Sequence, residues 1–110
     1  MDARDSGLIN VIIRGKCFQV AEEILASEPR VKIFLFGSRA LGTASSRSDI
    51  DLGIDIGRPI PPEKIVLLRE VFYDLPILQK VDLVDFSLVD SDFREVAMKG
   101  VVTLYERKIA

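Results

Sequence analysis

The sequence predicts a small domain of mixed α and β structure (α/β, of the α+β kind), with a mixed sheet of about four strands flanked by helices. The chain has 110 residues, the size of one domain, and we expect residues 1–110 to form a single domain. Short β-rich segments alternate with segments of helical periodicity. The composition is 48% hydrophobic and 29% charged, which is typical of a globular protein.

Helical periodicity, with apolar residues three and four positions apart, predicts three main helices. They are expected at residues 8–25, at 63–74 and within 87–99. Pro61 or Pro62 would start the second helix, since proline suits the first helical position. Pro76 prevents that helix from continuing.

The last of these helices carries local signals at both ends. Asp90 or Ser91 is expected to be its N-cap, because a short polar side chain can accept a hydrogen bond from the first turn. Gly100 is expected to end it as a C′ glycine. The side chains expected to face the core are Phe93, Val96 and Ala97.

Four β-rich segments predict the strands of the sheet, at residues 31–36, 49–56, 80–86 and 101–106. The second reads DIDLGIDI and alternates strictly. Because successive side chains of a strand point to opposite faces, Asp49, Asp51, Gly53 and Asp55 share one face, which we expect to be wet. A short turn or helix that opens at Gly37 and a polar loop at residues 43–48 join the first two strands.

The composition argues against direct nucleic-acid binding and against a structural zinc site. The formal net charge is −2, so there is no surplus of Lys and Arg for phosphates, and direct nucleic-acid binding is not expected. With no histidine and one cysteine, the chain lacks ligands for a structural zinc site. Cys17 cannot form an internal disulfide and is expected to pack as a small apolar residue.

The sequence also gives an expectation for the cellular compartment of the protein. No apolar run approaches the roughly 20 residues of a membrane span. Acidic residues stand where a signal peptide has a basic flank. We therefore expect no membrane association, and cytoplasm is the default expectation.

The acidic strand suggests a metal site. Asp49 and Asp51 would lie about 7 Å apart on one face, and their repulsion would raise their pKa values unless a cation intervened. Hard divalent ions such as Mg²⁺ prefer oxygen ligands, and two such ions can clamp the oxygens of a nucleotidyl transfer. Taken alone, the pair also fits an exposed acidic face on an edge strand.

The segment before this strand suggests a phosphate site. Gly37 allows close approach of the backbone to a phosphate, and Ser38 can donate from its hydroxyl and its amide. A helical turn from Ser38 to Leu41 would point free N–H groups at an anion. The alternative is an ordinary strand-to-helix turn capped by serine. The loop is neither a P-loop nor a dinucleotide-binding fingerprint.

Residues 37–54, GSRALGTASSRSDIDLGI, contain Gly-Ser, ten residues, then Asp-x-Asp. This pattern resembles the signature of the DNA polymerase β nucleotidyltransferase superfamily, and the fuller string resembles its minimal nucleotidyltransferase branch. KVDLVDF at 80–86 is similar to the family's third strand, and KGVVTLYE at 99–106 is similar to its closing segment. The resemblance implies a nucleotidyltransferase (polymerase β-like) fold over the whole chain.

The resemblance also implies an acidic trio. Asp49 and Asp51 match the family's metal ligands, for two Mg²⁺ ions, with Mn²⁺ as an alternative. Asp82 matches by position the third carboxylate, a further metal ligand that acts as general base or orients the acceptor hydroxyl. Asp85 is its rival, but an odd offset turns it to the opposite face from Asp82. Asp55 is expected to be merely exposed.

For the phosphates, the resemblance matches Gly37 and Ser38 to the family's triphosphate-holding pair. Arg39 and Arg47 either contact the phosphates or are ordinary solvent-facing charges. Ser48 supplies a further hydroxyl or only caps the turn before the acidic strand.

The resemblance implies a function as well. Members of this branch resemble antitoxins that transfer AMP from ATP to a tyrosine of a HEPN-type ribonuclease. One alternative is a non-catalytic module that neutralises a HEPN protein by contact. Another is nucleotidylation of a small molecule, which the lack of an acceptor domain opposes. Apolar residues on the outer helices fit either a dimer face or the core, so oligomeric state stays open.

Overall fold

The computed structural model describes residues 3–45 and 47–109. In chain order the elements are α1 (Ala3–Glu23), β1 (Arg30–Phe36), α2 (Ser38–Leu41), β2 (Ile50–Asp55), α3 (Pro62–Tyr73), β3 (Val81–Asp85), α4 (Ser91–Ala97) and β4 (Val102–Lys108). Every predicted helix and strand is therefore present, and α1 starts several residues earlier than expected. Met1 and Asp2, part of the acidic N-terminus considered above, lie outside the described residues.

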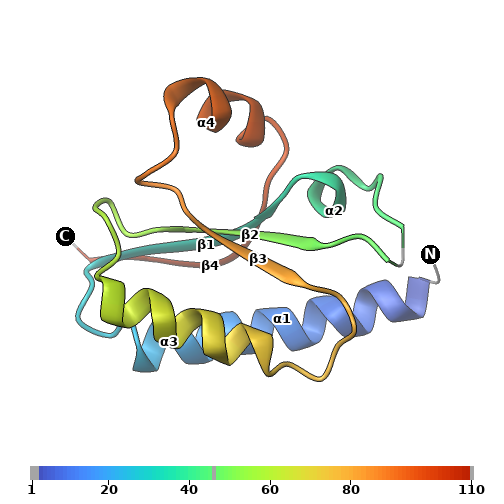
Figure 1. Ribbon diagram of the computed structural model, residues 1–110, viewed down its shortest axis with the longest axis horizontal. Coiled ribbons are helices and arrows are strands. Elements are labelled where there is room, and N and C mark those ends of the chain that lie inside the picture. Colours follow the sequence, from blue (N-terminus) through green and yellow to red (C-terminus); the bar gives the residue numbers. More distant parts are fainter. Residues whose placement is uncertain (1–2, 46, 110) are drawn as a thin grey trace.

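The four strands form one mixed sheet in the order β3-β2-β1-β4. β1 pairs antiparallel with β2 and β4, whereas β2 and β3 are parallel. Helices α1 and α3 cover one face, and α2 and α4 lie on the opposite side (Figure 1). The predicted α+β class is confirmed, and β3 and β4 are the edge strands.

The main core lies between the sheet and the two long helices. Their amphipathic periodicity is the reason, because α1 and α3 each turn one apolar stripe to the sheet. In α3, Leu68 and Phe72 are buried, and Ile65 and Val71 pack against them half-buried. Pro62 is the first residue of α3, as expected for proline at a helix start. None of the helices within the described ranges has the length and apolar character to span a membrane.

A second apolar cluster lies on the other face, beneath α4. Phe34, Phe36 and Phe86 form its buried centre. Phe34 and Phe36 are two residues apart on β1, so they share a face, and both lie edge-on to Phe86. This cluster covers part of the β2 face that was expected to be wet, and Gly53 is buried under it.

Helix α4 differs from its prediction. Asp90 is its N-cap and accepts a hydrogen bond from Phe93 N at 2.7 Å, which confirms one of the two expected caps. The inward orientation is confirmed for Ala97, which packs half-buried against the aromatic cluster, but was wrong for Val96, which is 68% exposed, and Phe93 is 43% exposed. The helix is too short to cover the aromatic cluster fully, so Phe93 only borders it, with its ring edge-on to Phe36.

The expectation for Gly100 was also wrong. The residue that caps α4 at its C-terminus is Met98, and Gly100 does not have a positive φ. A Cβ atom at Gly100 would lie 2.4 Å from Leu41 Cδ2, so the flexible end of the Leu41 side chain of α2 would have to shift. The glycine thus lets α2 pack against the end of α4.

Cys17 provides a first testable prediction. Its side chain is fully buried, as expected, and burial raises the pKa of the thiol from 9.0 to about 12, against a small opposing effect of Arg14. Above pH 9 the unfolded chain loses this proton and the folded chain keeps it. The free energy of unfolding should therefore fall by about 1.4 kcal/mol per pH unit between pH 9 and the folded pKa.

Denaturant unfolding at pH 8, 9 and 10 would measure this effect. Because other groups titrate in the same range, the comparison is with Cys17→Ala, whose stability deficit should shrink as the pH rises. A deficit that stays constant from pH 8 to pH 10 would contradict the prediction.

Candidate active site

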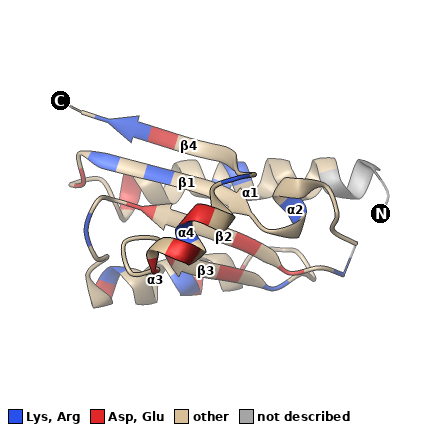
Figure 2. Cartoon of the chain, turned by 90° about the horizontal axis from the view of Figure 1, so that it is seen from above, with Lys and Arg blue, Asp and Glu red and all other residues tan. Residues whose placement is uncertain are grey.

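Three strands bring the key residues of the candidate site into one row. In the antiparallel register of β1 and β2, Phe36 lies opposite Asp51, and in the parallel register of β2 and β3, Asp51 lies beside Asp82. Residues paired in this way share a face of the sheet. The acidic segments of β2 and β3 lie next to each other (Figure 2). Asp49 directly precedes β2, two residues before Asp51.

Gly37 follows Phe36 and brings the backbone against the acidic strand. It has φ 72° and ψ −151°, a conformation that favours glycine. A Cβ atom at this position would lie 2.5 Å from Asp51 Oδ2. The missing side chain therefore lets the start of α2 stand directly beside the Asp51 carboxylate.

Asp51 is the electrostatic centre of the row. Burial raises the pKa of its carboxyl above the usual range, and the negative charges of Asp82 and then Asp49 raise it further. Three carboxylates on one face therefore repel one another without a cation between them. Their hard oxygen donors and their repulsion fit a divalent cation such as Mg²⁺.

Asp82 is held by a neighbouring cation. Lys80 Nζ lies 3.2 Å from Asp82 Oδ1, and both side chains are well exposed. Within residues 3–45 and 47–109, no three carboxylate, cysteine or histidine side chains are grouped closely enough to hold a metal ion. In this arrangement Asp82 is paired with Lys80, and Asp49 and Asp51 stay candidates for holding an ion.

Ser38 begins α2, as the sequence predicted. Its carbonyl accepts hydrogen bonds from the backbone N–H groups of Gly42 and Thr43 and so closes the turn. Its hydroxyl makes no hydrogen bond to another residue of the described ranges. The hydroxyl is therefore available to a ligand beside Asp51.

The structure gives different surroundings to the three further residues considered for phosphate binding, which are Arg39, Arg47 and Ser48. Arg39 Nη2 donates to the Ser48 carbonyl at 2.8 Å, which ties α2 to the loop before β2. Burial lowers the pKa of the Arg39 guanidinium from its usual value, but it stays a cation at neutral pH. The Ser48 hydroxyl accepts from Ser45 N at 2.9 Å, so its turn-capping role is observed. Arg47 is exposed, and its contact with phosphates stays a prediction.

Asp85 lies on the opposite face from Asp82, as the odd offset predicted. Its carboxylate accepts hydrogen bonds from Ile60 N at 2.8 Å, Ser87 N at 2.9 Å and Ser87 Oγ at 2.7 Å. These bonds hold the loop after β2 against the loop after β3. Asp85 is thus occupied in structural hydrogen bonds on the helix side of the sheet.

The expectation that Asp55 is merely exposed was wrong. Asp55 is buried, accepts a hydrogen bond from Gly57 N at 2.8 Å, and pairs with Arg94 Nη2 at 3.3 Å. Arg94 also donates to the Phe86 carbonyl at 2.6 Å and lies over the Phe86 ring. Sequence reasoning missed this pair because Arg94 stands 39 residues away on α4. The pair anchors α4 on the sheet.

Comparison with known proteins agrees with this fold. Residues 19–110 match the family described as Polymerase beta, Nucleotidyltransferase. The chain therefore belongs to this family and is a minimal nucleotidyltransferase of the polymerase β superfamily. It is 34% identical, over 80 residues, to the Haemophilus influenzae protein named probable protein adenylyltransferase MntA. The aligned residues cover 73% of this chain and 70% of that protein.

Two solved structures share the fold. A crystal structure of a toxin-antitoxin with AMP-PNP aligns with a TM-score of 0.57 and 21% identity, over 84% of this chain and 72% of the other. The structure of a candidate nucleotidyltransferase from Sulfolobus solfataricus also aligns with a TM-score of 0.57, at 20% identity, over 96% and 91% of the two chains. At these identities the likeness establishes the fold.

Proposed function

We propose that this protein is a metal-dependent adenylyltransferase that transfers AMP from ATP to a tyrosine hydroxyl of a HEPN-type ribonuclease and thereby acts as its antitoxin. The observation that carries the proposal is the row of Asp51 and Asp82 beside the Gly37–Ser38 turn, with Asp49 two residues before Asp51. In our proposal, Gly37 and Ser38 after β1 bind phosphate, Asp49 and Asp51 at β2 bind a cation, and Asp82 on β3 is a further carboxylate, so that the three functions lie on adjacent strands of the sheet.

The donor nucleotide would lie on the β1 side of the row. Ser38 would donate from its hydroxyl and its backbone N–H to the triphosphate, and Gly37 leaves room for that approach. Arg47, on the exposed loop, would contact the outer phosphates. Asp49 and Asp51 would hold Mg²⁺, or Mn²⁺ in its place, and the bound ions would neutralise charge on the phosphates.

The acceptor would lie on the β3 side, near Asp82. The tyrosine oxygen forms a bond to the α-phosphorus of ATP while the bond between the α-phosphorus and the bridging oxygen to the β-phosphate breaks. Pyrophosphate leaves with that oxygen. Asp82 takes the hydroxyl proton, or orients the hydroxyl for attack, once its carboxylate separates from Lys80.

The named relatives support this choice of reaction. The Haemophilus influenzae relative is called a protein adenylyltransferase, so a protein hydroxyl is the acceptor class that we propose here. One structural neighbour is a toxin-antitoxin crystallised with AMP-PNP, an ATP analogue. The HEPN identity of the partner rests on the resemblance of residues 37–54 to the minimal nucleotidyltransferases.

The test uses the purified protein, ATP, Mg²⁺ and a purified HEPN-type protein, taken from the reading frame next to the gene if that frame encodes one. Intact-mass spectrometry should show the partner gaining the mass of one or more adenylates. Asp49→Ala should abolish the gain, because it removes one of the two cation-binding carboxylates. Asp92→Ala, which removes an exposed aspartate of α4, is the matched control and should retain it.

The alternative of neutralisation by contact gives a different result. In that case the ribonuclease would be inhibited equally by the wild type and by Asp49→Ala, without ATP and with no gain in mass. This outcome would overturn the proposed function.

A further inference from the structure

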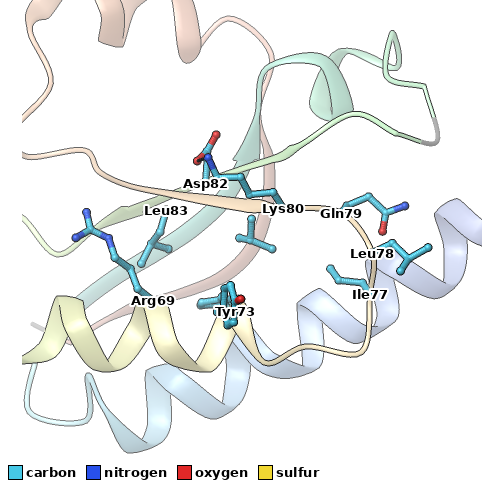
Figure 3. A pocket seen from close by; sticks show the side chains of 10 residues that line it. Arg69, Tyr73, Ile77, Leu78, Gln79, Lys80, Asp82 and Leu83 are labelled. Atoms are coloured by element: carbon cyan, nitrogen blue, oxygen red, sulfur yellow. Dashed lines mark ion pairs between the residues drawn. The ribbon is translucent and has the colours of Figure 1, made fainter.

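A cavity lies at the outer edge of the sheet, between α3 and β3 (Figure 3). Its volume is about 680 Å³, and residues of α3, of β3 and of the loop between them line it. Arg69 and Tyr73 rise from α3 on one side of β3, whereas Asp82 and Lys80 lie on the other side of the strand. The cavity therefore reaches from the helix layer to the carboxylate row.

The backbone along this cavity is an unpaired strand edge. At the ends of the β2–β3 ladder, Lys80 O accepts from Ile50 N, and Phe86 N donates to Ile54 O. Because alternate residues of a strand direct their backbone groups to opposite edges, the odd-numbered Val81 and Leu83 direct theirs outward. No other described residue pairs with these groups, and such an edge is a template for a further strand.

Several side chains that line the cavity are exposed to solvent. Tyr73 is 88% exposed and Leu78 is 100% exposed, so two large apolar surfaces stand open at the groove. Arg69 is exposed and forms no ion pair with any residue in the described ranges. Lys80, by contrast, is engaged by Asp82. The groove thus offers apolar surface and one unneutralised cation, which complements a chain segment with apolar residues and a carboxylate.

The position of the groove suggests what it holds. The turn at Gly37 lies on the β1 side of Asp51, and Asp82 lies on the β3 side. The positions that we propose for the phosphates, the cation and the base therefore follow one another across the sheet. A hydroxyl that approaches Asp82 from beyond the sheet must pass over the outer edge of β3. That edge is where the groove lies.

We infer that the groove between α3 and β3 seats the acceptor-bearing segment of the partner protein as an added strand along β3. This inference rests on the proposed function, because it concerns the polypeptide that carries the acceptor hydroxyl. An added strand lies about 4.8 Å from β3 and alternates its side chains between the two faces. The hydroxyl side chain opposite Asp82 then faces the carboxylate row. Its neighbours on the segment face Tyr73, Leu78 and Arg69.

Two variants test the two kinds of contact. Arg69→Glu reverses the charge in the groove, with Lys108→Glu on the opposite edge strand as its control. Val81→Pro removes one outward N–H from the first residue of β3, a place where proline is tolerated. Val81→Ala is its control, because it shortens the same side chain and keeps the N–H.

Initial rates of AMP transfer to the purified HEPN-type protein are measured against partner concentration, together with ATP affinity by calorimetry. Arg69→Glu and Val81→Pro should each raise the KM for the partner by about tenfold or more, with kcat and ATP affinity unchanged. Lys108→Glu and Val81→Ala should keep the wild-type KM.

The outcomes separate this inference from the proposed function. If wild type transfers AMP and both groove variants keep its KM, the docking site is overturned and the proposed function stands. If wild type transfers no AMP, the proposed function fails and the inference falls with it. If light scattering shows a wild-type dimer that Val81→Pro dissociates, the groove is a contact between copies of this chain, which also overturns the inference.

Discussion

Asp51→Asn is expected to lower AMP transfer to the partner by about 10³-fold, because a cation clamp supplies several kcal/mol of transition-state stabilisation. Asparagine keeps the size of the side chain and removes the charge that would hold the ion. Asp51 lies between Asp49 and Asp82 and beside Gly37, so this one change affects the whole row. The rate of partner adenylylation at saturating ATP and Mg²⁺ measures the effect.

The same variant should gain stability when Mg²⁺ is absent. Burial and two neighbouring carboxylates raise the pKa of Asp51, so the folded chain disfavours its charged form at neutral pH. Neutral asparagine removes that repulsion and should raise the melting temperature. The control Asp92→Asn, on exposed α4, should change neither the rate of AMP transfer nor the melting temperature. If Asp51→Asn lost thermal stability as well as activity, the loss of activity would indicate misfolding and would contradict this account of Asp51.

Gly53→Ala is expected to destabilise the fold by about 3 kcal/mol, the upper part of the range for overpacking a core. A Cβ atom at Gly53 would lie 2.5 Å from Phe34 Cζ and 2.8 Å from Phe86 Cδ1. Both rings are buried, so neither can move away without disturbing the cluster beneath α4. Thermal unfolding should show a melting temperature lower by roughly 15 °C.

Gly15→Ala is the matched control for this substitution. Gly15 is exposed on α1, and no atom would lie within 4 Å of an added Cβ. The same chemical change should stabilise the protein there by about 0.5–1 kcal/mol, because alanine favours a helix interior over glycine. Equal melting temperatures for the two variants would show that Gly53 is not confined by the aromatic rings.

Much of the fold was predictable from local pattern. The segment 49–56 alternates with period two, and its acidic and apolar faces are the two faces of β2. The periodic segments and the prolines located α1 and α3, and a short polar residue before a helical segment located the Asp90 cap. The odd offset between Asp82 and Asp85 also placed these two carboxylates correctly on opposite faces.

The failures share a physical cause, which is that burial depends on what packs above a residue. Asp55 has the same alternation as Asp51, but α4 covers it and Arg94 neutralises it. Val96 has the spacing of a core residue, but α4 has only the edge of an aromatic cluster to cover. The open groove beside β3 does not follow from spacing along the chain.

The sequence by itself determined the elements and the family, because these depend on periodicity and on the string at residues 37–54. Only the tertiary structure decided which carboxylates lie side by side. The parallel register of β2 and β3 places Asp82 beside Asp51, and the positive φ of Gly37 brings the start of α2 against the same carboxylate. Strand order and register are set by packing between segments distant in the chain. The electrostatics of Asp51, and the groove that we propose for the acceptor, are therefore properties of the folded sheet.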